Sequence, residues 1–97
     1  MNILIADSGS TKCDWMAIDA AGQVLGEFNT MGFNPYFHDA NLVSKVMMDT
    51  PEAVEMASDV DRVYFYGAGS SSESLCAVIR DGLERVFPNA TVLVGHD

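Results

Sequence analysis

An uninterrupted apolar run near the start of the chain, residues 2–6 (NILIA), leads directly into the carboxylate of Asp7. A short run of this kind, with no polar alternation, is typical of a central strand buried on both faces of a sheet. The polar segment that follows, 8–11 (SGST), contains a glycine and suits a turn. We therefore expect a central strand with polar groups at its carboxyl end, and the rest of the fold must be arranged around it.

Four further segments are interpreted as strands, the first two from the short loops and turn residues beside them and the last two from their apolar and aromatic runs. The first three strands are joined by short loops and predict an antiparallel meander, whereas the last two are entered through helical segments and should run parallel to the first. Aromatic residues on these strands are expected in the core. The further strands are predicted at 12–19, 24–28, 62–66 and 90–94, and the aromatic residues are Trp15, Tyr64, Phe65 and Tyr66.

Helical segments separate the later strands. Asp39 is placed to cap one helix, and Thr50, followed by a proline, marks the cap of a second, short one. The longest helix is predicted over residues 70–87, with Ser70 and Glu73 at the spacing of a capping box. The order βββαβαβ is that of an α/β protein with a mixed five-stranded sheet.

Size and charge narrow the class of protein further. The chain has 97 residues, 48% of them hydrophobic, so residues 1–97 are interpreted as one domain. Its net charge of -9, with only five scattered Lys and Arg, disfavours a nucleic-acid partner. No apolar run approaches the roughly 20 residues that span a bilayer, and no signal peptide is recognisable. We therefore expect a cytoplasmic protein with neither membrane nor nucleic acid as a partner.

The segment 7–12 (DSGSTK) contains the groups that phosphoryl transfer needs. Gly9 allows unusual backbone geometry, so successive N–H groups can point toward one anion. The hydroxyls of Ser10 and Thr11 and the charge of Lys12 add donors. Asp7 supplies a carboxylate suited to Mg²⁺ beside a phosphate. A polar turn between two strands, with no ligand, is the alternative interpretation.

Other phosphate motifs fit this chain less well. The pattern GxxxxGK[ST] is absent, and its loop leads into a helix rather than a strand. A dinucleotide-binding GxGxxG motif fails because Ser72 stands where the third glycine should follow Gly67 and Gly69. A DxDxT phosphatase motif would need an aspartate at position 9, which is glycine.

Several motifs together resemble a known family. The set DSGSTKCDW, GFNP, VYFYGAG, FP and a terminal HD is similar to the N-terminal domain of BadF/BadG/BcrA/BcrD-type ATPases, in particular their N-acetylglucosamine kinase branch. These proteins belong to the actin, hexokinase and heat-shock ATPase superfamily. The resemblance covers essentially the whole chain and implies one ribonuclease H-like lobe of an actin-like ATPase fold.

The resemblance also implies an activity, an ATP-dependent transfer of phosphate to an amino sugar such as N-acetylglucosamine, with ATP and Mg²⁺ as cofactors. It assigns the Mg²⁺ to Asp7, and it assigns Asp97 both to the sugar and to catalysis, as the base that takes the proton from the attacking hydroxyl. By the same resemblance, the ATP phosphates are assigned to Gly9, Ser10, Thr11 and Lys12, and the sugar to Asn34, Gly67, Ala68 and Gly69.

Three functions stay open at this point. Members of the superfamily bind nucleotide between two lobes, so we expect this single lobe to show little kinase activity alone. The second possibility, an ATPase that activates a dehydratase, would need cluster-binding cysteines, yet Cys13 and Cys76 are interpreted as buried thiols and His38 and His96 as structural. The third is a non-catalytic sugar-sensing or oligomerisation module. A homodimer of the full-length protein also stays open.

Overall fold

The computed structural model of the chain describes residues 1–67, 69 and 71–96. Its elements follow the predicted order, and the short second helix is present. They are β1 (Ile3–Ser8), β2 (Lys12–Ile18), β3 (Val24–Met31), α1 (Ala40–Met48), α2 (Pro51–Met56), β4 (Arg62–Gly67), α3 (Glu73–Val86) and β5 (Thr91–His96).

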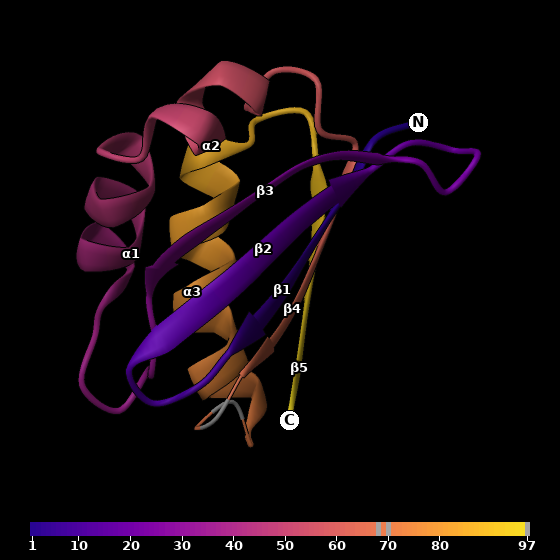
Figure 1. Ribbon diagram of the computed structural model, residues 1–97. Coiled ribbons are helices and arrows are strands. Elements are labelled where there is room, and N and C mark those ends of the chain that lie inside the picture. The colour runs from indigo at the N-terminus through magenta and orange to yellow at the C-terminus, as the bar shows by residue number, and fades with distance from the viewer. Residues whose placement is uncertain (68, 70, 97) are drawn as a thin grey trace.

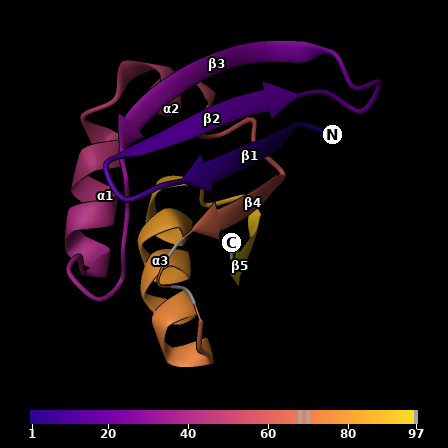
Figure 2. The ribbon, with the colours of Figure 1, turned by 60° about the horizontal axis from the view of Figure 1, so that its bottom comes forward.

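The strands form a mixed sheet in the order β3-β2-β1-β4-β5. β2 is antiparallel to its neighbours β1 and β3, so β1 and β3 run in the same direction, and β4 and β5 also run parallel to β1. This arrangement confirms the predicted α/β class and the ribonuclease H-like mixed sheet. The register places Asp7 beside Tyr66, and Gly67 beside His96, so the carboxyl ends of β1, β4 and β5 meet at one edge. This carboxyl edge is turned toward the viewer in Figure 2.

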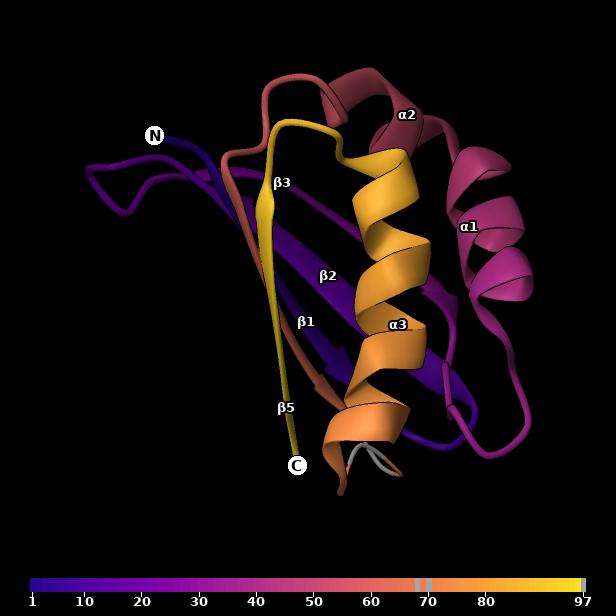
Figure 3. The same cartoon turned by 180° about the vertical axis from the view of Figure 1, so that it is seen from behind.

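All three helices cover the same face of the sheet, as Figure 1 and Figure 3 show from opposite sides. The two crossovers carry the chain in the same direction across the sheet, and right-handed connections then place their helices on one side. Leu4 and Ala6 face the helices and are fully buried, while Ile3 and Ile5 are only half-buried. The prediction that the first strand is buried on both faces is wrong, because no helix of the described chain covers the second face.

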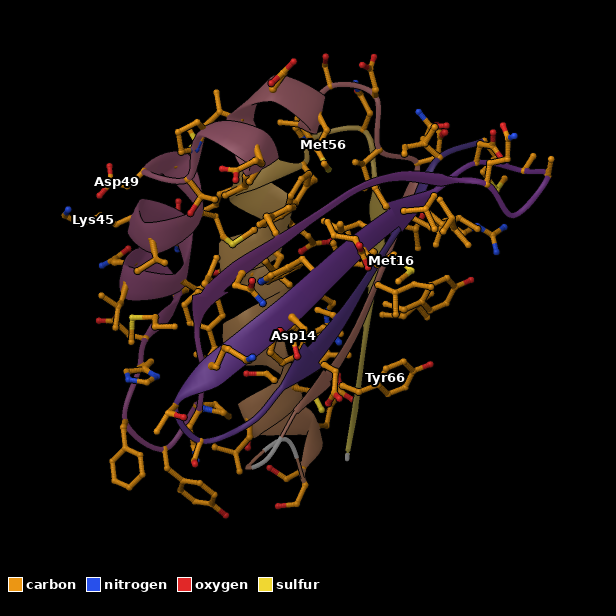
Figure 4. All side chains as sticks on the ribbon, viewed as in Figure 1. Asp14, Met16, Lys45, Asp49, Met56 and Tyr66 are labelled. Carbon is orange, nitrogen blue, oxygen red and sulfur yellow. The ribbon has the colours of Figure 1, made fainter. Side chains whose placement is uncertain are left out.

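Aromatic rings fill the layer between sheet and helices. The rings of Trp15 and Phe28 are stacked, with their centroids 5.7 Å apart and an angle of 3° between their planes. The ring centroid of Phe65 lies 6.0 Å from that of Trp15. Trp15 and Phe65 are core residues, as predicted, and burial of each such ring contributes about 2–3 kcal/mol. The prediction that Tyr64 and Tyr66 also belong to the core is wrong. Both lie on the open face, where Tyr66 is 45% exposed (Figure 4).

β3 is longer than the sequence predicts. Its predicted end at residue 28 is wrong, and the strand continues to Met31. The register explains the extension, because Met31 pairs with Lys12 and Thr30 pairs with Cys13. Pairing with β2 thus overrides the weak strand preference of the last residues. As a result, the end of β3 comes level with the loop that follows β1.

The helix caps agree with the sequence in part. Asp39 caps α1 by accepting a backbone N–H three residues later at 2.8 Å, as predicted. Thr50 stands at the predicted start of α2, but its hydroxyl donates to a carbonyl oxygen of α1. The predicted capping box is wrong. Ser72 caps α3, Glu73 is the first helical residue, and Ser70 lies outside the described residues.

Sulfur-containing side chains are divided between core and surface. Met47 is fully buried, whereas Met48, the next residue of α1, is 56% exposed. Cys13 and Cys76 are both buried, as predicted. Within the described residues, no helix combines the length and apolar character needed to cross a membrane.

Candidate active site

The loop between β1 and β2 lies at the carboxyl edge and turns the chain within three residues. The backbone N–H of Gly9 donates to the carbonyl oxygen of Lys12 at 2.8 Å and closes this turn. The N–H of Gly9 is therefore used within the loop and does not point toward a ligand. Ser10 and Thr11 are exposed and donate to none of the described residues. The donors left for an anion are those of Ser10 and Thr11 and the ammonium group of Lys12.

Gly9 differs from the expectation in its conformation. Of the described glycines, those with a positive φ are Gly22 and Gly69, so the prediction that Gly9 adopts a backbone geometry other residues resist is wrong. A Cβ built on Gly9 would meet the carbonyl oxygen of Lys12 at 3.5 Å, which is an ordinary contact. The absence of a side chain at Gly9 therefore leaves the surface of the loop uncovered, which would let a phosphate approach the backbone.

A buried hydroxyl fixes this loop to the segment that follows β3. Ser8 is fully buried, and its Oγ accepts the backbone N–H of Phe33 at 2.8 Å. Gly32 packs so tightly that a Cβ there would lie 2.2 Å from the carbonyl oxygen of Gly9. We did not identify Ser8 from the sequence. Its signal was available, since Leu4, Ala6 and Ser8 alternate on the buried face of β1.

Asn34 is the centre of the turn after β3. Its backbone N–H donates to Nδ1 of His38 at 3.0 Å, and its carbonyl oxygen accepts the N–H groups of Phe37 and His38 at 2.9 Å each. Its side-chain Oδ1 accepts the N–H of Tyr36 at 3.0 Å. His38 is therefore structural, as expected. The side-chain Nδ2 of Asn34 is the group that could donate to a ligand.

The structure brings Asn34 together with Gly69, 35 positions later in the chain. Gly69 has φ +83°, and a Cβ at this position would lie 2.4 Å from Oδ1 of Asn34. Gly67, at the end of β4, is also confined, because a Cβ there would lie 2.7 Å from Cε1 of Phe65 and 3.3 Å from Cβ of Ser8. Thus the three segments that contain Ser8, Asn34 and Gly69 meet at the carboxyl edge.

Asp7 lies on the open face of the sheet, directly opposite Asp14 on β2. Nδ2 of Asn29 donates to Oδ1 of Asp14, and Nζ of Lys12 lies 3.5 Å from the same oxygen. Like charges directly opposite on neighbouring strands repel, which favours a cation between or beside them. Figure 4 shows Asp14 on the side of the sheet away from the helices.

These carboxylates fit Mg²⁺ in the form that phosphate sites use. Mg²⁺ usually keeps several waters and takes one or two carboxylates together with phosphate oxygens. Asp7 and Asp14 can supply one or two carboxylates, and no group of three or more potential ligands is present among the described residues. A cation here would therefore depend on the bound phosphate for part of its coordination.

Two of the predicted site residues, Ala68 and Asp97, lie outside the described residues. The catalytic role of Asp97 therefore stays a prediction. β5 ends at His96, whose partner in the register is Gly67, so the chain does reach the carboxyl edge immediately before Asp97.

Beneath the loop, burial raises the pKa of the Cys13 thiol to about 12, an effect that hydrogen bonding to Ser8 opposes only in part. The thiol is therefore protonated at neutral pH. A metal cluster needs the thiolate form, so the surroundings of Cys13 disfavour a role in binding one.

No protein-family model and no curated protein matches the chain. Among solved structures, it is similar to a provisionally named N-acetylglucosamine kinase from Porphyromonas gingivalis, with 35% sequence identity and a TM-score of 0.82. This likeness covers 97% of the present chain and 33% of that protein. An exopolyphosphatase from Cytophaga hutchinsonii has a similar fold at 15% identity and a TM-score of 0.50, over 99% of the present chain and 34% of its own.

The chain thus spans about a third of the length of these solved structures. The first comparison confirms the resemblance to the N-acetylglucosamine kinase branch. With the observed sheet, it also establishes the fold as one lobe of an actin-like ATPase.

Proposed function

We propose that this chain is the phosphate- and sugar-binding lobe of an ATP-dependent kinase that phosphorylates an amino sugar such as N-acetylglucosamine. The observation that carries the proposal is the meeting of three segments at the carboxyl edge: the loop at 9–11, the turn at Asn34 and the glycine at position 69. Ligands of open α/β sheets bind at this edge. The similarity to a provisionally named N-acetylglucosamine kinase supports the choice of substrate.

On the phosphate side, the loop offers the hydroxyl and N–H donors of Ser10 and Thr11 and the ammonium group of Lys12. Charge-assisted hydrogen bonds from such groups to phosphate oxygens are short and strong. Asp7 would hold Mg²⁺ through its waters, and the ion would neutralise charge on the phosphates. In this site Gly9 leaves room for the phosphate rather than donating to it, since its N–H is already bonded within the turn.

On the sugar side, Asn34 would donate from Nδ2 to a sugar oxygen, while Gly67, Ala68 and Gly69 would line the same side of the sugar with backbone. Oδ1 of Asn34 already accepts from Tyr36, so this bond fixes which end of the amide faces the sugar. The proton of the attacking hydroxyl would pass to Asp97. A carboxylate within hydrogen-bond reach of that hydroxyl is the usual base in phosphoryl transfer to an alcohol.

The proposal is tested by measuring ADP release from ATP-Mg²⁺ with and without N-acetylglucosamine, using the longest chain that contains these 97 residues. We expect sugar-dependent release that Asp97→Asn reduces by at least about 100-fold, as for loss of a general base. Asn34→Ala should raise KM for the sugar more than KM for ATP. The 97-residue chain alone should show little turnover.

Other results would point to the other functions. Hydrolysis of ATP that does not depend on sugar would support a dehydratase-activating ATPase and contradict a kinase. Sugar binding without ADP release, unchanged by Asp97→Asn, would identify a non-catalytic sugar-sensing module. Either result would overturn the proposal.

A further inference from the structure

A second concave surface lies at the other end of the sheet, between β3 and α2. It is a groove of about 330 Å³. Its floor is apolar and belongs to the core, with Ala17, Phe28 and Val60 each at most 6% exposed. Figure 1 shows α2 at the end of the molecule opposite the carboxyl edge, so the groove is separate from the candidate active site.

One wall of the groove is formed by an irregularity in β3. The register between β2 and β3 shifts at Ala17 and Ile18, where Gly26 pairs with Ala17 and Val24 with Ile18, so Leu25 is the extra residue. A bulge of this kind redirects a side chain, and Leu25 lines the groove while remaining 54% exposed. Met56, labelled on α2 in Figure 4, also lines the groove.

Gly26 keeps the groove open. A Cβ built on Gly26 would meet no heavy atom within 4 Å, and the residue does not have a positive φ. Neither the backbone conformation nor the packing of neighbouring atoms therefore requires a glycine at position 26. A side chain at position 26 would instead project into the space of the groove.

The rim of the groove is acidic and is not neutralised by the chain itself. Three carboxylates of the segment 52–59 line it, and among the described residues no Lys or Arg forms an ion pair with any of them. Of the five basic side chains, four pair with other carboxylates, and Arg62 donates to the hydroxyl of Tyr64. The rim residues are Glu52, Glu55 and Asp59, and the carboxylates paired elsewhere are Asp14, Asp49, Glu73 and Asp81.

We propose that this groove docks an extended polypeptide segment of a partner protein in which every second residue is, in turn, aliphatic and Lys or Arg, so that both kinds of side chain face the groove. The aliphatic side chains would pack on the floor beside Leu25, and the cations would pair with the rim. β3 is an edge strand, and no strand of the described sheet pairs with its outer side. An extended segment could therefore add to this edge, with alternate side chains facing the groove.

Charge complementarity favours this occupant over a second copy of the chain. The chain has a net charge of -9, so two copies repel each other. A small inorganic cation would satisfy the rim but leave the apolar floor exposed to water. A segment with both kinds of side chain satisfies both surfaces.

Fluorescence anisotropy with a labelled octapeptide, in which lysine and leucine take turns at every second position and threonine fills the positions between them, tests the proposal on the 97-residue protein. The wild-type protein should bind it with a Kd below about 1 mM at low salt, and the affinity should fall as salt rises. The same peptide with glutamate in place of lysine should not bind.

Two variants separate the apolar floor from the acidic rim. Gly26→Leu fills the groove and should weaken binding at least tenfold, whereas Gly26→Ala should weaken it less than Gly26→Leu does. Glu52→Gln with Glu55→Gln should also weaken binding about tenfold. The matched control is Glu73→Gln with Glu84→Gln on α3, which removes the same net charge away from the groove and should change the Kd less than twofold.

Three results would overturn the proposal. The lysine peptide could fail to bind. The control pair on α3 could weaken binding as much as the rim pair, which would indicate a response to net charge alone. Spermine could compete fully while Gly26→Leu has no effect, which would mean that the apolar floor takes no part.

Discussion

One glycine lies near each end of β3, Gly26 close to its start and Gly32 directly after its end, and the space around the two glycines differs. A Cβ on Gly32, just after the strand, would lie 2.2 Å from the carbonyl oxygen of Gly9, whereas a Cβ on Gly26 would meet nothing within 4 Å. The carboxyl edge is therefore built by backbones in close contact, which leaves its loops little freedom. The opposite end is open and presents a groove. One strand thus supports a closely packed candidate active site at one end and an unfilled surface at the other.

The largest expected effect follows from adding a methyl group at the crowded end. Gly32→Ala should lower the free energy of unfolding by about 3 kcal/mol, the upper part of the usual range for overpacking, because the group it meets is backbone and cannot rotate away. Urea unfolding followed by the fluorescence of Trp15, which is 2% exposed, measures the change. A loss below 0.5 kcal/mol (roughly the size of a neutral surface change) would contradict the close approach.

The second prediction tests the contact between Asn34 and Gly69. Gly69→Ala should cost about 2 kcal/mol, because alanine is strained at φ +83° and its Cβ meets the Asn34 side chain. Adding Asn34→Ala to this variant should recover the part of the lost stability that comes from the contact with the Asn34 side chain. The part that comes from backbone strain at position 69 should remain lost. A double-mutant cycle in urea measures this coupling, expected to be about 1 kcal/mol. Additive single effects would show that the two residues are not in contact.

The third prediction concerns the buried thiol beneath the loop. Unfolded Cys13 loses its proton near pH 9.0, but burial raises its folded pKa to about 12. Between these values the folded state holds a proton that the unfolded state has lost, so stability falls as pH rises, by about 1.4 kcal/mol per pH unit. Below pH 9 the thiol is protonated in both states, so the stability that its protonation contributes is fully present.

Cys13→Ala removes this titration. Free energies of unfolding for wild type and variant at pH 7.5 and pH 10 should show that the wild type loses about 1.4 kcal/mol more than the variant. Equal losses in the two proteins would mean that Cys13 is accessible to solvent in the folded state.

Much of the fold could be predicted from periodicity and turn residues. The first strand, its polar carboxyl end and the cap at Asp39 follow from local sequence alone, and the structure agrees. The burial of Ile5 could not be predicted, because an apolar run looks the same whether one or both faces are covered. The length of β3 was missed for a related reason, since its last residues are extended only by pairing with β2.

The candidate site was predictable as a motif but not as a geometry. The sequence points to 7–12 and Asn34 separately, while their meeting depends on Ser8 and on the close approach of Gly32 to Gly9. Both are contacts between distant segments, which spacing along the chain cannot indicate. The acidic groove was missed similarly, because Glu52 and Glu55 have the pattern of an ordinary solvated helix face until β3 is placed beside them.

The smallest expected effect is at the open end and completes the comparison. Gly26→Ala should leave the free energy of unfolding unchanged or raise it by up to about 1 kcal/mol, because the added methyl group meets no atom and alanine restricts the unfolded chain more than glycine does. Urea unfolding beside Gly32→Ala gives the difference between the two ends directly. If Gly26→Ala were as damaging as Gly32→Ala, the loss could not come from a clash. The open groove at the start of β3 would then have to be closed in solution, and the contrast between the two ends would fail.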